Sequence, residues 1–446
     1  MRGARRRPQR LRISRAIWPR KRVACRNSRC FVIEPSEVAG MVGQMVGRLM
    51  VLIGLLLTAS IHAQAAPGEH FVLLPKDVPP PNSTKPTDFD PEFVERPANA
   101  VPQVPQGFEI SLFASHLQHP RSLAVAPDGD VFVVGEGPGI IFRLRDSDGD
   151  GKADQVREFA SGFRTPHGIA LRDGQIYIGD TNAVWRAPYQ GRDSVPISEF
   201  QRVTKAPDLR PLGWHATRDI VFDSTGKLYL AIGARDDLSE QPLPDASIEH
   251  VGSDGEMTPF ATGLRNVEGL AFFPGTDDLW VTVNERDKLG ARTPSDFLAH
   301  AGQGDFFGWP YAYNGPNPDP VFGAKRPDLV AKSKMPEVLL GAHSAPLGLV
   351  FYTGAQFPAE YRNDAFVAIH GSGPYDTLDG YKVVRVRFKN GRPVGGYDDF
   401  ITGFSVKSNG HLYVWGTPSQ LAVANDGSLL VVDDKGACVW RVSVKK

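Results

Sequence analysis

The stretch Arg121-Ser-Leu-Ala-Val125, followed by the turn Asp128-Gly129 and then by Val131-Phe-Val-Val134, is the first copy of a pattern that decides the fold. Each copy joins two short apolar strands through a turn rich in Gly, Asp or Asn. Five further copies begin at His167, Arg218, Asn266, Leu347 and Gln420. A repeat that cannot bury its own faces must stack against its neighbours, and paired strands at this period are typical of propeller blades. The pattern therefore predicts an all-β fold, a six-bladed β-propeller.

Both ends of the repeat region supply strands that would close such a ring. Residues 108–113 precede the first copy, and residues 438–444 end the last one. We expect these strands to pair, because pairing would remove exposed sheet edges. The longest interval lies between the fourth and fifth copies and predicts an insertion at about 291–340, a candidate lid or substrate-binding loop. Within it, residues 294–301 are the best candidate for a short helix.

Residues 1–65 are predicted to be a leader that the mature protein lacks. A run of Arg and Lys without any acidic residue covers residues 1–26, and an apolar run follows at 49–57. That run is shorter than the roughly 20 residues of a membrane span, and Ala63-Gln-Ala65 offers a signal peptidase site. We expect cleavage after Ala65 and a periplasmic or secreted protein; a nucleic-acid-binding arm is the alternative for the basic run. Translation is expected to start at Met41, Met45 or Met50.

The rest of the chain divides into a tether and one large domain. Lys+Arg and Asp+Glu balance at 50 each, so the charge favours neither nucleic acid nor a membrane as partner. Residues 66–105 are rich in proline and predict an extended tether, on the body or in solvent. Residues 106–446 form the predicted propeller domain. Cys438 is the one cysteine outside the leader, which excludes a disulfide framework.

Polar residues directly before the inner strands are expected to converge on one mouth of the tunnel. Many are His and Arg, whereas structural caps are usually Ser, Thr, Asp or Asn. Each of them alone is more often a structural histidine or a solvated arginine. Together they predict a cationic pocket for an anionic ligand, with an imidazole as general base. The set comprises His119, Arg121, His167, His215, Arg218, Arg265, Asn266, His343, Ser344 and Thr417.

A second pattern, Asp146-Ser-Asp148-Gly-Asp150-Gly-Lys-Ala-Asp154, gathers carboxylates in one turn. Alternate acids that lead into a glycine turn suit a hard cation such as calcium. The loop is not an EF-hand, because Arg157 stands where the bidentate Glu belongs. We predict that Asp146, Asp148, Asp150 and Asp154 bind a structural calcium ion at a blade edge. An acidic surface turn is the alternative.

Several stretches resemble the soluble pyrroloquinoline-quinone-dependent glucose/sorbosone dehydrogenase family, and most closely its sorbosone dehydrogenase-like branch. The most specific are Gly213-Trp-His215-Ala-Thr-Arg218, Gly263-Leu-Arg265-Asn266-Val-Glu-Gly-Leu and Val283-Asn-Glu-Arg286-Asp287. The resemblance runs from residue 108 to residue 444. It implies a six-bladed propeller that holds pyrroloquinoline quinone (PQQ) over the tunnel, with calcium bridging the quinone and the protein.

The resemblance also implies roles for individual residues. His215 would remove the hydroxyl proton of the substrate while hydride passes to the quinone, and the backbone at Arg286 and Asp287 would bind the active-site calcium. We add Arg218, on the same rim, as a second catalytic residue. The residues expected to bind the cofactor are His167, Arg265, Asn266, Arg121 and His343.

We therefore predict a PQQ-dependent dehydrogenase that acts on CH–OH or aldehyde donors, namely a sugar or a sugar-derived aldehyde. Its electrons would pass to an acceptor of the respiratory chain, and the protein would be neither an integral membrane protein nor a nucleic-acid partner. One alternative is a calcium-dependent propeller lactonase, which needs several tunnel carboxylates around a metal. The other is a non-catalytic binding propeller, since Thr417 and Ser419 stand where relatives carry cofactor-binding arginines.

Overall fold

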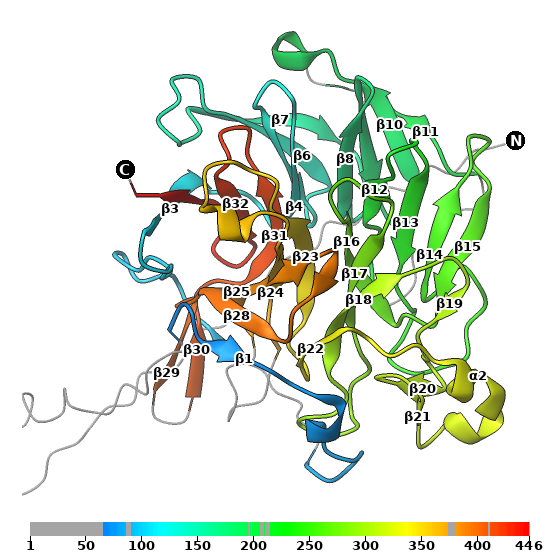
Figure 1. Cartoon of the computed structure of the whole chain (residues 1–446). Coiled ribbons are helices and arrows are strands. Elements are labelled where there is room, and N and C mark those ends of the chain that lie inside the picture. The colour runs from blue at the N-terminus through cyan, green and yellow to red at the C-terminus, as the bar shows by residue number, and fades with distance from the viewer. Residues whose placement is uncertain are drawn as a thin grey trace, which may run out of the picture. The chain divides into compact units, whose positions relative to one another are not determined.

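The computed structural model describes residues 66–85, 91–194, 197, 199–205, 209, 215–372, 380–408 and 411–445; the predicted leader and its cleavage site lie outside these residues. Regular structure in the described residues is almost entirely β-strand (Figure 1). The helices in this part of the chain are one α-helix, α2 (Pro327–Lys332), and four 3-10 turns, η1 (Pro75–Asp77), η2 (Gly191–Asp193), η3 (Gly323–Lys325) and η4 (Ala359–Tyr361). No described helix is long and apolar enough to cross a membrane.

Six of the described sheets contain four or five strands, and each begins at one predicted copy of the repeat. Sheet 1 contains β4 (Pro120–Val125), β5 (Val131–Gly135), β6 (Ile140–Arg145) and β7 (Gln155–Ser161). Sheet 2 contains β8 (Gly168–Arg172), β9 (Gln175–Gly179), β10 (Val184–Pro188) and β11 (Gln201–Arg202). Sheet 3 contains β12 (Ile220–Phe222), β13 (Leu228–Ile232), β14 (Ser247–Val251), β15 (Met257–Thr262) and, parallel to β15, β19 (Asp305–Phe306).

The second half of the chain repeats this plan. Sheet 4 contains β16 (Asn266–Phe272), β17 (Leu279–Asn284), β18 (Asp296–Ala301) and β22 (Val338–Gly341). Sheet 5 contains β23 (Pro346–Phe351), β24 (Ala365–Ile369), β25 (Lys382–Val386), β28 (Tyr397–Ile401) and β1 (His70–Phe71). Sheet 6 contains β31 (Pro418–Val423), β32 (Leu429–Asp433), β33 (Cys438–Val444) and β3 (Phe108–Ser115). A smaller three-stranded sheet contains β2 (Glu92–Phe93), β30 (His411–Val414) and β29 (Ser405–Ser408). Two further sheets have two strands each: one pairs β20 (Ala312–Tyr313) with β21 (Asn317–Pro318), and the other pairs β26 (Phe388–Lys389) with β27 (Arg392–Pro393).

The repeat is rich in apolar residues because the second strands of most sheets are buried. β5, β13, β24 and β32 are buried at every position. A strand covered on both faces reads as a continuous apolar run rather than as an alternating one. The turn before β5 contains Gly129, whose φ of 91° is accessible to glycine without steric cost.

The first strands of the six sheets contact one another in a closed cycle, and Figure 1 shows several of them together near the middle of the view. The order of contacts is β4, β8, β12, β16, β23, β31 and back to β4. The predicted pairing of the chain's early and late strands is confirmed, because β3 pairs antiparallel with β33 from Phe108 opposite Val444 to Ser115 opposite Cys438. Sheet 6 is thus built from both ends of the repeat region.

The helix predicted at residues 294–301 was wrong. Most of that segment is β18, which pairs with β17 on one side and β22 on the other. Its side chains are buried at nearly every position, so its apolar residues serve a central strand rather than a helix face. The predicted insertion at 291–340 therefore includes two strands of sheet 4, and β19, β20, β21, η3 and α2 lie between them.

The described parts of the proline-rich segment lie on the body, which was one of the two predicted alternatives. β1 pairs with β28, and β2 pairs with β30. Between them, the Asn82 N–H donates to the Leu289 carbonyl (2.5 Å), and the Ala291 N–H donates to Thr84 Oγ1 (2.9 Å). The segment therefore fastens the loop that follows β17.

Candidate functional site

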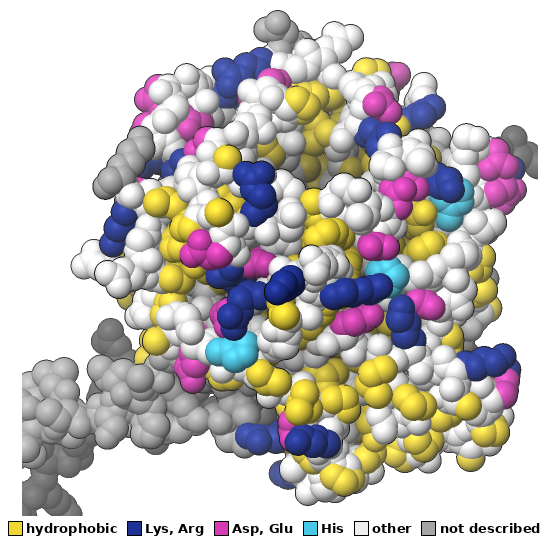
Figure 2. Space-filling view, in the orientation of Figure 1, with side chains coloured by type: hydrophobic (Ala, Val, Ile, Leu, Met, Phe, Trp, Pro, Cys, Tyr) yellow, Lys and Arg dark blue, Asp and Glu magenta, His cyan; other side chains and the backbone are white. Residues whose placement is uncertain are grey.

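The cycle of first strands brings together polar residues from all six sheets. Figure 2 shows basic, acidic and His side chains gathered near the middle of the face that Figure 1 also presents. The residues directly before the first strands were predicted to converge, and the contacts described below join many of them. Sequence reasoning selected the cationic members of this group, whereas the structure adds the anionic ones.

His215 lies shortly before β12 and has a defined tautomer. Its Nδ1 is 2.7 Å from the carbonyl oxygen of Ala234. Because a carbonyl only accepts, Nδ1 carries the proton and Nε2 carries a lone pair. Burial and, next, the nearby Arg265 cation lower the pKa of His215 below its usual value. His215 is therefore a neutral imidazole that is able to accept a proton at Nε2.

Arg265 directly precedes β16, is only 5% exposed and ties together two loops. Its Nη1 donates to the Glu285 carbonyl (2.7 Å), while Nη2 lies 3.1 Å from Asp237 and 3.0 Å from Asp287. Asp237 also accepts the backbone N–H of Asp287 (2.7 Å). The guanidinium thus sits between two carboxylates and fixes the loop that follows β17.

His343 contributes a second cation next to Arg265. Its Nδ1 lies 3.3 Å from Asp287, and its Nε2 lies 3.0 Å from the Gly290 carbonyl oxygen. Burial opposes protonation of this ring, but the bonds to Asp287 and Gly290 outweigh it and raise the pKa of His343 to about 9. Both ring nitrogens therefore donate, and His343 is cationic at neutral pH.

Glu268 is the centre of a buried network that sequence reasoning missed. It is 3% exposed and receives His167 Nε2 at 3.0 Å, Thr217 Oγ1 at 2.7 Å and Asn266 Nδ2 at 2.6 Å. The Arg121 guanidinium lies 3.7 Å away. A signal was present, since Glu268 follows Asn266 by two positions in β16 and alternate residues of a strand share a face. Burial opposes ionisation, but the cations hold the pKa of Glu268 well below its usual value.

Asp434, directly after β32 of sheet 6, was also missed and connects this sheet to sheets 1 and 5. It lies 3.2 Å from Arg121 and 3.2 Å from His370, and it accepts a hydrogen bond from Thr417 Oγ1 (2.7 Å). Burial opposes its ionisation, but His370 and Arg121 lower its pKa well below the usual range. Thr417, predicted to lie at the mouth, therefore positions this carboxylate.

Two predicted site arginines, Arg218 and Arg286, contact protein groups beside the mouth. Arg218 is 3% exposed and donates to the backbone carbonyls of Thr217 (2.5 Å) and Leu209 (2.8 Å). Burial lowers its pKa to about 10. Arg286 forms a buried ion pair with Asp319. Both guanidinium groups brace the backbone around the site, and Arg218 Nη1 also reaches the backbone carbonyl of His215 (3.4 Å).

The loop after β17, where the resemblance implied calcium, is engaged by guanidinium groups. The Arg265 side chain approaches the carbonyls of Asn284 (3.5 Å) and Glu285 (2.7 Å), and Arg286 Nε donates to the Asp287 carbonyl (3.1 Å). A cation bound at these oxygens would meet two positive side chains. These groups therefore do not fit calcium at this loop.

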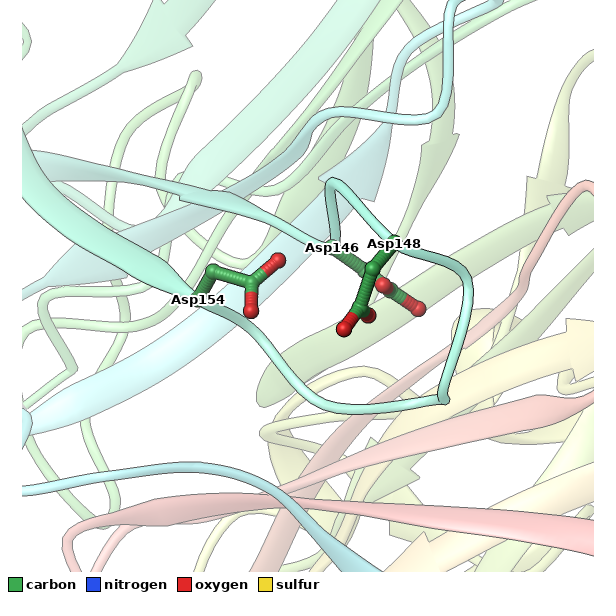
Figure 3. A group of neighbouring side chains, drawn as sticks. All are labelled: Asp146, Asp148 and Asp154. Carbon is green, nitrogen blue, oxygen red and sulfur yellow. The ribbon is translucent and has the colours of Figure 1, made fainter.

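The acidic loop between β6 and β7 brings three of its four predicted ligands together (Figure 3). One oxygen each from Asp146, Asp148 and Asp154 lies within 4.8 Å of the others. Asp150 is not part of this group, and its carboxylate accepts the Lys152 N–H (2.8 Å). Figure 3 shows the three carboxylates directed toward the inside of the loop.

Two known proteins are similar to the chain in sequence. The chain is 27% identical over 357 residues to an uncharacterized protein of Borreliella burgdorferi, covering 77% of this chain and 91% of that one. It is also 27% identical over 207 residues to the aldose sugar dehydrogenase YliI of Escherichia coli K12, covering 41% of this chain and 53% of that protein.

The fold matches a solved structure along most of its length. The holo form of the PQQ domain of pyranose dehydrogenase from Coprinopsis cinerea superimposes with a TM-score of 0.64 and 18% identity, covering 79% of this chain and 98% of that domain. The resemblance to PQQ-dependent soluble sugar dehydrogenases predicted from the sequence is thereby confirmed. The TrAA12-like family model matches residues 102–300 and 328–445, so the chain belongs to the TrAA12-like family.

Proposed function

We propose that this protein is a PQQ-dependent dehydrogenase, built on a six-bladed propeller, that oxidises a sugar or a sugar-derived aldehyde. The family match, the aldose sugar dehydrogenase relative and the PQQ-domain neighbour support the reaction class. The cycle of six inner strands supports the blade count. The observation that carries the proposal is the neutral His215 imidazole beside a set of buried cations.

The residues at the mouth fit an anionic cofactor. PQQ is a tricarboxylate, and here Arg121, Arg265 and His343 carry positive charge, each beside a carboxylate of the protein, while His167 offers a ring nitrogen. Several buried donor atoms have no hydrogen-bond partner among the described residues: Arg121 Nε, Arg265 Nε and His167 Nδ1. Buried polar atoms normally find partners, so we assign carboxylates and quinone oxygens of the cofactor to these donors, with Asn266 beside them.

His215 has the geometry of a general base for this oxidation. When bound, PQQ would supply the hydride acceptor for the substrate carbon. His215 Nε2 takes the hydroxyl proton, so the electron pair of the O–H bond becomes the new C=O bond as hydride leaves. The Ala234 carbonyl keeps the Nδ1 proton in place throughout. Arg265 disfavours protonation of His215 before substrate arrives and therefore keeps the base ready.

Three finer assignments complete the proposal. The basic and apolar pattern of residues 1–65 supports export and cleavage after Ala65. Electrons from the reduced cofactor pass to an acceptor of the respiratory chain. Calcium binds the acidic loop at Asp146, Asp148 and Asp154, where it stabilises sheet 1 rather than taking part in the reaction.

Reconstitution tests the proposal directly. Purified apoprotein is mixed with PQQ and calcium, and reduction of a dye is followed with aldoses, sorbosone and simple alcohols as substrates. Saturable cofactor binding with sugar-dependent dye reduction is the expected result. Absence of PQQ binding at micromolar cofactor would overturn it in favour of a binding propeller, and lactone hydrolysis that needs only calcium would favour the lactonase.

A further inference from the structure

The Glu268 carboxylate contacts polar side chains from four of the six sheets, through hydrogen bonds and one ion pair. His167 precedes β8, Thr217 precedes β12, Arg121 belongs to β4, and Asn266 shares β16 with Glu268 itself. Three of these contacts are hydrogen bonds of 2.6 to 3.0 Å, and the Arg121 guanidinium lies 3.7 Å from the same carboxylate. A buried carboxylate is stable only when such partners compensate for its lost hydration.

The directions of these hydrogen bonds specify a carboxylate rather than an amide at position 268. His167 Nε2, Thr217 Oγ1 and Asn266 Nδ2 all donate, and both oxygens of Glu268 accept. A glutamine of the same shape would turn its NH₂ group toward one of these partners, and His167 could satisfy it only as the neutral tautomer whose Nε2 accepts, so it would no longer donate from Nε2. The negative charge is therefore built into the geometry of the site.

The negative charge of Glu268 acts on the ring of His167, which is 4% exposed. Its Nε2 proton is committed to Glu268, and its buried Nδ1 has no hydrogen-bond partner among the described residues. Burial opposes protonation of the ring, but Glu268 outweighs it and raises the pKa of His167. The other charged or titratable groups that face this pair are Arg121 from β4, Asp219 directly before β12, the neutral His215 and, beyond Arg121, Asp434 and Glu136.

We propose that Glu268 is a positioning residue that keeps His167 a donor at both ring nitrogens and so presents Nδ1–H to an anionic oxygen of the cofactor. This inference deepens the proposed function and rests on it. Because the charge resides on a titrating ring, cofactor affinity is high where His167 is protonated and falls as pH rises through its titration. Glu268 thereby sets the pH range in which the anion is held.

The first experiment uses the apoprotein and needs no cofactor. The ring of His167 is titrated by NMR with histidine-selective labelling, and the His167→Asn variant identifies its signal. In the wild type His167 is expected to titrate above the usual 6.5, and Glu268→Gln is expected to move the titration below that value. A wild-type titration at or below 6.5, or an unchanged titration in Glu268→Gln, would overturn the proposal.

The second experiment measures PQQ affinity against pH by fluorescence quenching. Glu268→Gln is expected to weaken binding about tenfold at neutral pH, as for the loss of one charge-assisted hydrogen bond, and to abolish the pH step. Glu249→Gln is the matched control, since Glu249 is also buried but lies in β14 and accepts from Ser247. The control should keep wild-type affinity. A pH step retained in folded Glu268→Gln would contradict the proposal.

The experiments distinguish a failure of the role proposed for Glu268 from a failure of the proposed PQQ-dependent function. If the wild type binds no PQQ at any pH, the function is refuted, whereas the apoprotein titration still decides the role of Glu268. If Glu268→Gln does not fold, the wild-type titration of His167 and the pH dependence of wild-type affinity remain. Wild-type affinity that does not change through the titration of His167 would then overturn the proposal.

Discussion

Replacing Arg265 with Gln is expected to destabilise the apoprotein by about 4 kcal/mol, since it removes a cation from between two carboxylates. The bond to the Glu285 carbonyl accounts for about 1.5 kcal/mol and the pair with Asp237, which is 15% exposed, for about 2 kcal/mol. Asp287 is 46% exposed, so solvent screening reduces its share to about 0.5 kcal/mol. Asp237 and Asp287 are then left facing each other without a shared partner.

Urea unfolding of the apoprotein at neutral pH, followed by tryptophan fluorescence, measures this loss. Arg265→Lys keeps the charge but not the planar fork, so it should recover no more than about half of the loss. Arg326→Gln is the control, since Arg326 is an exposed residue paired with Asp328, and it should leave the midpoint unchanged. A loss below about 1 kcal/mol for Arg265→Gln would refute the claim that this guanidinium organises the site.

Three further predictions concern the base, its surroundings and a buried acid. Because burial and Arg265 lower the pKa of His215, turnover of the PQQ-loaded protein should rise with pH through a value below 6.5 and then stay level; a rise centred above 6.5 would contradict this. Gly233→Ala should lower both PQQ affinity and turnover, because a Cβ there would overlap Asn266 Oδ1 and lie 2.6 Å from His215 Cβ. Gly302→Ala, whose nearest neighbour is 3.2 Å away, is its control, and equal effects of the two substitutions would argue against the steric account. Burial raises the pKa of Glu249 from 4.5 to about 7, so its ionisation lowers the free energy of unfolding as the pH rises from 4.5 to about 7. Glu249→Gln should therefore gain up to about 3 kcal/mol relative to the wild type in urea unfolding above this pH range, and no gain there would contradict the linkage.

Much of the fold was predictable because the repeat is local. Most inner strands are joined to their partners by a short turn, so apolar runs and turn residues within about a dozen positions predict them; the exception is the longer connection from β23 to β24. The pairing of β3 with β33 followed from the need to cover sheet edges. The segment at β18 was not predictable in the same way, because β18 lies between β17, the second strand of the fourth copy, and β22, a strand outside the repeat pattern. Burial on both faces removes the periodicity that separates a strand from a helix.

The candidate site was predictable only in its cationic half. His167, His215 and Arg265 occupy equivalent places before inner strands, so the repeat itself pointed to them. Their anionic partners have no common place, since Glu268 lies within β16, Asp434 follows β32 and Asp237 lies in a loop. These pairings depend on distances between sheets that a linear pattern does not contain.

The same limit applies to the arginines and the acidic loop. Arg218 and Arg286 share the sequence context of the site, yet their guanidinium groups contact backbone carbonyls or a buried carboxylate beside it. In the acidic loop, Asp150 belongs to the alternating pattern, but its carboxylate lies outside the group that Asp146, Asp148 and Asp154 form. Side-chain direction decided these cases, and residue type alone did not.

The central claim is that His215 accepts the substrate proton while PQQ is held by the cations around it. The most direct test is a single turnover in which PQQ-loaded protein is mixed rapidly with an aldose and cofactor reduction is followed by absorbance. We expect wild-type reduction to be at least about a hundredfold faster than reduction in His215→Ala, as for loss of a general base, with equal amounts of cofactor bound. Equal rates in the two proteins, or no reduction by any sugar in PQQ-loaded wild type, would contradict the account.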